Sequence, residues 1–306
     1  EWAIASYQNQ KVGSTYITYD NFQGPPWFTD APDVFGKVGS AMIPVAPVAM
    51  GGGTLTYSAV GLPPGLSINT NTGEITGTPV TTGDTAITLT VTGTNATGEP
   101  RSDSETVTVR VSDPSLYPYK MDLTFSGYTG SSAIKDFPAV VDFHQDLTVS
   151  GGSQSANFSY NTFLSPTAAD LRFFGANGRE LPYEIEDWNS SGHSRVWVNV
   201  GDLNGTGTVV TAAWGNAQDA LAPDYIFDGS AWLNDFHGVW HFSELVASNF
   251  VDSSYKSHHG LAVGDTTTTA GVVGPAVALD GNGDYVDFGE SAGHMDKVFT
   301  VSAWAK

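Results

Sequence analysis

The sequence predicts an all-β protein built from tandem β-sandwiches, and three observations support this fold class. Short segments such as residues 85–92 and 105–111 alternate apolar with other residues, which is the period-two pattern of a strand with one buried face. Gly, Pro, Asn and Asp gather between these segments and mark closely spaced turns. No apolar stripe with helical spacing runs for a useful length. We therefore expect short strands joined by turns.

The composition narrows the class of protein. A length of 306 residues suggests two or three domains. The sequence has no cysteine, which excludes disulfides and thiolate chemistry, and its 14% of charged residues is typical of secreted β-rich proteins. The net charge of −20 argues against nucleic acid and anionic membranes as partners. No apolar run approaches the roughly 20 residues that span a bilayer. From the composition, we expect an extracellular or cell-surface protein.

Residues 1–36 are predicted to form an N-terminal extension. Residues 15–19 alternate β-branched with aromatic side chains and predict a strand, which the residues at 24–28 interrupt. This strand either packs on a neighbouring domain or pairs with the sheet of another subunit, which would give self-association. The chain begins without Met and ends shortly after the last predicted hairpin. We therefore expect the natural protein to be longer.

A motif rich in proline and glycine occupies residues 61–79. Its two adjacent prolines fix φ and end the preceding strand, Leu66 and Ile68 then point to one side, and an Asn-Thr-Gly turn brings Ile75 back. With its flanking strands, the motif resembles the Ig-like repeats of bacterial surface proteins over residues 37–113. The resemblance implies a β-sandwich spacer in which the motif forms core and turns.

A second β-sandwich is predicted for residues 114–228. Its segments at 137–138, 181–186 and 196–198 resemble an uncharacterised β-sandwich domain that precedes LamG-like domains in bacterial and archaeal surface proteins. No activity is established for that domain, so the resemblance implies none. The predicted strands lie at residues 119–125, 139–143, 171–174, 180–186, 195–200 and 208–214.

Residues 276–289 predict a β-hairpin whose turn consists of Asp, Gly and Asn residues that tolerate positive φ. Together with segments at 239–242, 252–254 and 259–261, this hairpin resembles the start of a LamG-like, concanavalin A-like jelly roll. Residues 229–306 are therefore expected to be the N-terminal part of such a domain. The resemblance implies binding of glycans or proteins, often with Ca²⁺.

Ca²⁺ is the cofactor that the predicted turn favours. Asp280, Asn282 and Asp284 supply the hard oxygen donors that Ca²⁺ prefers, and the LamG-like resemblance adds Asp252. The alternative is that these residues occupy the turn only for their backbone conformation. Trp188 lies in a polar segment and is the tryptophan expected to be most exposed, as a platform for a glycan; packing in the core or a turn is its alternative.

Glu184 and Glu186 are the paired carboxylates that a glycosidase would need. Two residues apart on a strand, they share a face with Cα atoms roughly 6.5–7 Å apart, a spacing compatible with hydrolysis. Their alternation with Ile185 is also the pattern of a solvated strand face, which is the interpretation we favour. His241 is expected in the core rather than on a metal. No catalytic residue is predicted.

These observations predict a non-catalytic extracellular protein for adhesion or glycan recognition, with a glycan or a surface protein as its partner. One alternative is a structural subunit of a surface layer or extracellular filament, in which residues 1–36 pair with a neighbouring chain. A weaker alternative is a set of accessory modules of a polysaccharide-degrading enzyme.

Overall fold

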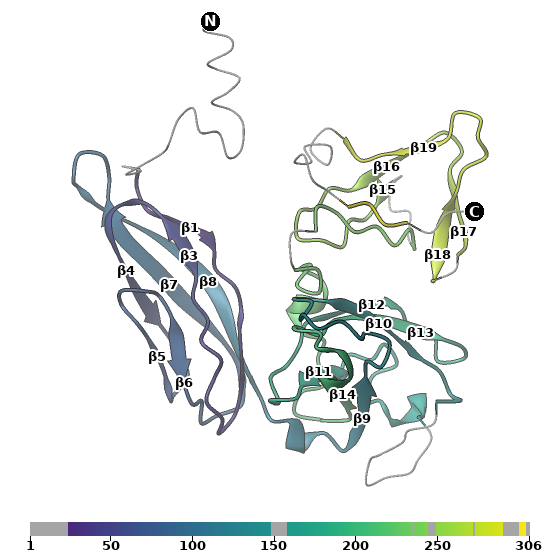
Figure 1. Cartoon of the computed structure of the whole chain (residues 1–306), viewed down its shortest axis with the longest axis horizontal. Helices are drawn as coiled ribbons and strands as arrows, with labels where there is room; N and C mark the ends of the chain where they lie inside the picture. Colours follow the sequence, from purple (N-terminus) through teal and green to yellow (C-terminus); the bar gives the residue numbers. More distant parts are fainter. Residues whose placement is uncertain are drawn as a thin grey trace, which may run out of the picture. The chain divides into compact units, whose positions relative to one another are not determined.

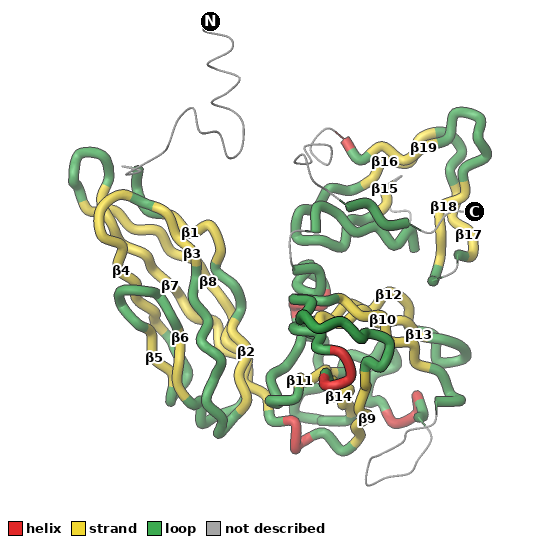
Figure 2. The backbone as a smooth tube through the Cα atoms, in the orientation of Figure 1, coloured by secondary structure: helices red, strands yellow, loops and turns green. Residues whose placement is uncertain are grey.

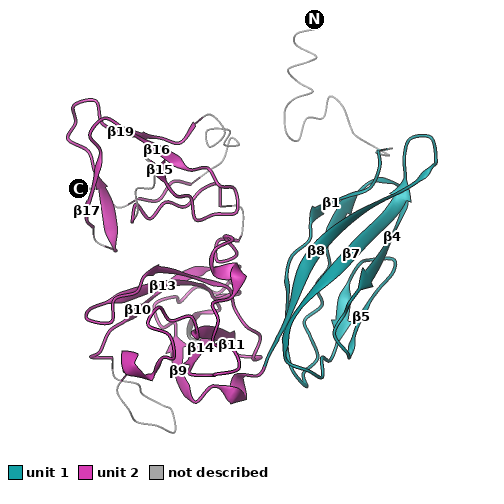
Figure 3. Ribbon diagram, turned by 180° about the vertical axis from the view of Figure 1, so that it is seen from behind, with its two compact units in different colours: residues 1–112 teal, residues 113–306 magenta. Residues whose placement is uncertain are grey.

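The computed structural model describes residues 24–147, 158–233, 236–243, 249–271, 273–289 and 300–303. The chain divides into two compact units, residues 1–112 and 113–306 (Figure 3). Within the described residues, the first unit consists of β-strands and loops and the second adds short 3-10 turns (Figure 2), which confirms the all-β prediction. The same residues contain no helix with the length and apolar character that a membrane span requires.

The described part of the first unit contains eight strands (Figure 1). They are β1 (Trp27–Asp30), β2 (Val34–Lys37), β3 (Val48–Met50), β4 (Gly52–Val60), β5 (Leu66–Ile68), β6 (Ile75–Gly77), β7 (Gly83–Thr94) and β8 (Pro100–Ser112). The largest sheet has the order β2-β8-β7-β4, and β1–β3 and β5–β6 form two smaller sheets. All these pairs are antiparallel except β2 and β8, which run parallel.

The alternation in β7 explains how the large sheet buries one face. Ile87, Leu89 and Val91 are buried, whereas Thr88 and Thr92, at alternate positions, are exposed and Thr90 is half-buried. Because successive side chains of a strand point to opposite faces, one face of β7 packs into the unit and the other meets solvent. The buried cluster consists of Val34, Met42, Ile75, Ile87, Leu89, Val107, Val109 and Val111.

The first unit includes strands that the sequence analysis assigns to an N-terminal extension. β1 and β2 lie largely within residues 1–36, yet β1 pairs with β3 and β2 pairs with β8. Both strands are therefore internal to the first unit and do not belong to an extension available for another subunit. The strand predicted at residues 15–19 lies outside the described residues.

The motif at residues 61–79 forms the predicted hairpin, β5–β6. The side-chain oxygen of Asn69 accepts hydrogen bonds from the backbone N–H of Asn71 and Thr72 and so orders the turn. At the base of the hairpin, Gly65 has φ +93°, and a Cβ at this position would lie 2.0 Å from the carbonyl oxygen of Thr78. Only glycine fits there.

A comparison of Gly65 with Gly98 separates the effect of a close backbone contact from the effect of a positive φ alone. Both have positive φ, but a Cβ at Gly98 would meet nothing within 4 Å. We expect Gly65→Ala to destabilise the first unit by more than about 2 kcal/mol, because the backbone at Thr78 must move. Gly98→Ala should cost about 1 kcal/mol. Urea unfolding of both variants measures the difference, and equal costs would contradict the explanation.

Six strands form the first part of the second unit, as predicted, with ends shifted by up to three residues. They are β9 (Tyr119–Thr124), β10 (Pro138–Phe143), β11 (Arg172–Gly175), β12 (Tyr183–Asp187), β13 (Ser194–Asn199) and β14 (Val209–Trp214). They form two three-stranded sheets, β10-β13-β12 and β11-β14-β9. Phe173 of β11 lies 6.3 Å from Phe143 of β10 and 5.1 Å from Tyr183 of β12, measured between ring centroids. The two sheets therefore pack face to face through aromatic side chains.

A buried arginine lies beside this aromatic layer. The guanidinium of Arg172, on β11, is fully buried. One terminal nitrogen donates to the carbonyl oxygens of Ala169 and Leu171, at 2.9 and 2.6 Å. The other donates to a carboxylate oxygen of Asp219 and to the carbonyl oxygen of Leu221, at 2.5 and 2.7 Å. One side chain thus fixes the course of the chain just before β11 and in the loop after β14.

Glu180 and three tyrosines complete the network around the guanidinium. Glu180 is fully buried, with Oε1 3.4 Å from Nε of Arg172, and it accepts a 2.6 Å hydrogen bond from the Tyr225 hydroxyl. The hydroxyl of Tyr117 donates to Asp219, and that of Tyr183 donates to the carbonyl oxygen of Leu171. Burial opposes the charged form of Arg172, but the acidic groups around it hold its pKa above the ordinary value.

Removing the guanidinium leaves two acidic partners in place without their cation. We expect Arg172→Met to destabilise the second unit by about 3–5 kcal/mol, because breaking one side of a buried ion pair costs more than the pair contributes. Lys120→Met, which removes an exposed cation from β9, should stay within about 0.5 kcal/mol. Chemical denaturation followed by tryptophan fluorescence compares the two variants, and a small effect at Arg172 would show that the network is dispensable.

Five short strands follow: β15 (Asn249–Phe250), β16 (Gly260–Val263), β17 (Thr267–Ala270), β18 (Pro275–Ala278) and β19 (Tyr285–Asp287). They form the sheets β15-β16-β19 and β17-β18. The hairpin predicted at residues 276–289 is therefore wrong in its pairing: β18 and β19 flank the turn, but β18 pairs with β17 and β19 with β16. The turn connects two sheets. The LamG-like assignment stays a prediction.

Candidate functional site

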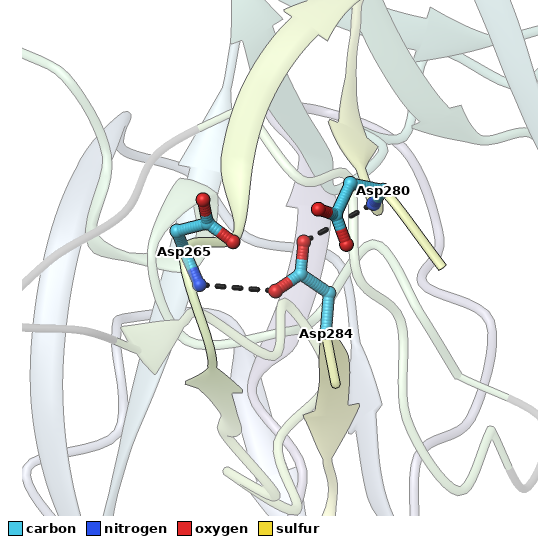
Figure 4. Close-up of side chains that lie close together, drawn as sticks. All are labelled: Asp265, Asp280 and Asp284. Carbon is cyan, nitrogen blue, oxygen red and sulfur yellow. Dashed lines mark hydrogen bonds between the residues drawn. The ribbon is translucent and has the colours of Figure 1, made fainter. Parts of the chain in front are cut away.

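Three carboxylates meet beside the turn between β18 and β19 (Figure 4). Asp280 and Asp284 come from this turn, and Asp265 comes from the connection between β16 and β17. One oxygen from each carboxylate lies within 4.8 Å of the other two. The structure thus brings together two predicted ligands and adds Asp265, which sequence reasoning missed because it lies far from the turn in sequence.

Asp284 has a structural role in this acidic turn. Its two carboxylate oxygens accept hydrogen bonds from the backbone N–H of Asp265, at 3.0 Å, and of Asp280, at 3.1 Å (Figure 4). These N–H groups, that of Asp280 first, lower the pKa of Asp284. The Asn282 backbone N–H donates to Asp280 at 2.6 Å. The turn is therefore ordered by its own carboxylates, and oxygen lone pairs of Asp265 and Asp280 remain the donors for a cation.

Asp252, the fourth predicted ligand, has a different environment. It is buried, and its carboxylate accepts four hydrogen bonds of 2.8–2.9 Å, from the N–H groups of Val239, Ser254 and His258 and from the Ser254 hydroxyl. It is not among the three carboxylates of the acidic turn. The structure therefore places Asp252 as the organiser of its own loop, because every direction around the carboxylate already holds a donor.

Trp188 packs against the aromatic core instead of standing free. Its ring lies 5.0 Å from Phe163, 5.3 Å from Tyr160 and 5.9 Å from Phe143, measured between centroids. The residue is half-buried. The packing alternative therefore describes the buried part of this ring, and a glycan platform on its exposed part stays a prediction.

We expect Trp188→Ala to act on stability. Losing a ring that contacts three others should destabilise the second unit by about 3 kcal/mol, whereas Trp188→Phe should retain most of the packing. Thermal unfolding provides the comparison. If Trp188→Ala left the melting temperature unchanged but abolished binding to a glycan, the platform interpretation would be supported.

Glu184 and Glu186 contact donors from several parts of the second unit, which corrects the prediction of a solvated strand face. Both lie on β12, and their side chains are 20% and 1% exposed. The side chain of His241, 11% exposed, contacts both. With Trp232 and Ser253, these residues form what we call the glutamate cluster.

Glu184 is held by three side chains. The indole N–H of Trp232 donates to Oε2, the Ser253 hydroxyl donates to Oε1 at 2.6 Å, and Nε2 of His241 lies 3.4 Å from Oε2. Burial disfavours the charged form of Glu184, but these hydrogen bonds and the charge of His241 outweigh it and lower its pKa.

Glu186 lies deeper and has fewer partners. The indole N–H of Trp197 donates to its Oε2 at 2.6 Å, and Nδ1 of His241 lies 3.7 Å from the same oxygen. Burial dominates here and raises the pKa of Glu186 above its ordinary value, although His241 and Trp197 oppose it. Two neighbouring glutamates thus have pKa values displaced in opposite directions.

The comparisons with known proteins identify the first unit. A family model described as "Putative Ig domain" matches residues 25–112, less than a third of the chain. This confirms the Ig-like part of the sequence analysis, and the match begins at residue 25 whereas the predicted domain begins at residue 37. No curated protein matches the sequence.

Solved structures give only partial likenesses. A "putative alpha-galactosidase" from Bacteroides fragilis is 25% identical, covering 31% of this chain and 19% of its own, with a TM-score of 0.26. The human desmocollin-1 ectodomain is 15% identical over 60% of this chain and 35% of its own, with a TM-score of 0.25. Protocadherin gamma B2 extracellular domains 3–6 are 15% identical over 85% and 50%, with a TM-score of 0.24. The chain thus spans from about a fifth to a half of these proteins, and at such TM-scores none bears on function.

Proposed function

We propose that this chain is the non-catalytic, extracellular part of a surface protein that serves adhesion, with a glycan or another surface protein as its partner. The observation that carries the proposal is the Ig-domain match over residues 25–112. The motif at residues 61–79 of this domain forms a hairpin and its turn, as expected of a spacer. A second sandwich follows it in the same chain, as in modular surface proteins.

The environment of the paired glutamates supports a non-catalytic role. A displaced pair of carboxyl pKa values is also the arrangement of a general acid and base. A glycosidase, however, must present both carboxyl groups to the sugar. Glu186 is 1% exposed, and both carboxylates accept hydrogen bonds from side chains that hold the fold together. Catalysis would require these bonds to break.

An assay of binding and of sugar release distinguishes adhesion from hydrolysis. We expect the purified chain to be retained on an array of glycans or of surface proteins, and to release no reducing sugar from the glycans that retain it. Glu186→Gln should leave retention unchanged. Sugar release that disappears in Glu186→Gln would contradict the proposal and identify an enzyme.

Ca²⁺ is the cation proposed for the acidic turn. Asp265, Asp280 and Asp284 offer converging carboxylate oxygens, which suit a hard cation. Two oxygens of Asp284 already accept backbone N–H groups, so Ca²⁺ would need further ligands from water or backbone carbonyls. This favours a weak, solvent-exposed site of the extracellular type.

Calorimetry tests the cation. We expect Ca²⁺ to bind with a Kd on the order of 10⁻⁴–10⁻³ M, and Asp280→Asn to weaken binding about tenfold because one carboxylate charge is lost. Asp146→Asn, an exposed acid outside the acidic turn, is the control and should bind as the parent chain does. An absence of heat at millimolar Ca²⁺ would leave the acidic turn as a backbone feature only.

A further inference from the structure

The glutamate cluster joins the six-stranded sandwich to the segment that follows it. Glu184 belongs to β12 of the sandwich, whereas its three partners, Trp232, His241 and Ser253, all come from the chain after residue 228. One carboxylate thus receives contacts from three separate positions of the following segment. Hydrogen bonds to a charged acceptor are stronger than those between neutral groups, so this carboxylate is a concentrated point of attachment.

The hairpin β17–β18 covers the other glutamate. Its turn is closed by a 2.8 Å hydrogen bond from the N–H of Gly271 to the carbonyl oxygen of Gly274. Gly274 has φ +74°, and a Cβ there would lie 2.3 Å from Oε1 of Glu186. The absence of a side chain therefore allows the backbone of the hairpin to rest on a buried carboxylate.

His241 makes the attachment dependent on protonation. Its ring stacks on Trp197 at 5.7 Å and 23°, with Nε2 3.4 Å from Glu184 at hydrogen-bond distance and Nδ1 3.7 Å from Glu186 at ion-pair distance. A neutral imidazole carries one N–H and can serve only one carboxylate, whereas an imidazolium carries two. The geometry, with one ring between two carboxylates, matches the protonated form.

We propose that Glu184, Glu186 and His241 form a proton-sensitive latch that holds the segment after residue 228 on the sandwich while Glu184 is ionised and the imidazole is protonated. The latch closes in a window of pH and loosens on both sides of it. On the alkaline side, the imidazolium loses its charge and one N–H, so both glutamates lose their cation. On the acid side, Glu184 takes up a proton and stops accepting charged hydrogen bonds.

The order of events on the acid side follows from the surroundings. Arg195 is the further charged group that acts on Glu186, and it opposes protonation there. Burial nevertheless raises the pKa of Glu186, while the pKa of Glu184 is lowered. As the pH falls, Glu186 is protonated first, and because its folded pKa is raised this step favours the attached state. The contribution of ionised Glu184 is present above its unfolded pKa and is lost last, as the pH falls through its lowered folded value.

Amide hydrogen exchange of the whole chain, expressed as protection factors across pH, tests the latch. We expect residues 249–263 to be most protected at mildly acidic pH and less protected on either side. Glu184→Gln should lower their protection about tenfold within this window and flatten the profile, because it replaces an acceptor oxygen with a donor amide. Protection of β9 and β14, which lie away from the latch, should not change.

Two further variants guard against a general loss of structure. Ser253→Ala removes one donor to Glu184 and should lower protection about threefold without altering the pH at which it is lost. Asp142→Asn disrupts the exposed pair of Asp142 with His193, whose side chains are 46% and 57% exposed. It should change neither the protection nor its dependence on pH.

The latch would be overturned by a parent chain whose protection at residues 249–263 is flat across pH. It would equally be overturned if the pH profile persisted in Glu184→Gln and His241→Gln. If Glu184→Gln failed to fold, Ser253→Ala would decide. Lower protection factors that are lost at the same pH as in the parent chain would support the latch. Protection factors equal to those of the parent chain would contradict it.

Discussion

The second unit is organised around one charge that water cannot reach. The guanidinium of Arg172 is fully buried and is directed at acids and carbonyl oxygens from segments before β11 and after β14. Because a buried cation is tolerated only where acceptors surround it, each of those segments must adopt the course that brings its oxygen to the guanidinium. The aromatic layer between the two sheets then packs beside a fixed frame. Strand pairing alone would leave the loops after β14 free to take other paths.

The glutamate cluster also joins separate segments through charged groups, but these groups titrate more readily than a guanidinium. Arg172 keeps its charge at any ordinary pH, so its contacts persist under all conditions in which the chain is folded. Glu184, Glu186 and His241 join a neighbouring segment to the sandwich through carboxyl and imidazole groups, which change charge at far lower pH than a guanidinium does. The same unit therefore contains a permanent polar centre inside the sandwich and a conditional one at its margin. The acidic turn adds a third polar centre, ordered by backbone N–H groups.

The sequence predicted what depends on neighbours along the chain and missed what depends on distant residues. The strands of both sandwiches and the hairpin β5–β6 follow from alternation and turn residues, which are local signals. The pairing of β18 with β17 and of β19 with β16 is not local, so a hairpin was expected instead. Glu184 has the pattern of a solvated strand because its donors Trp232 and Ser253 lie 48 and 69 residues further along. Asp265 joined the acidic turn without any sequence signal for the same reason.

The parallel pair β2 and β8 has a mechanical consequence for the Ig-like unit. β2 lies near the beginning of the unit and β8 is its last strand, and their backbones are hydrogen-bonded in register from Val34↔Val109 to Lys37↔Ser112. Tension applied through the two ends of such a unit draws these strands past each other along their length. The inter-strand hydrogen bonds are then strained simultaneously in shear and do not open one at a time as in a zipper. A module with this geometry resists stretching, which is what a tether between a cell and a surface experiences in flowing liquid.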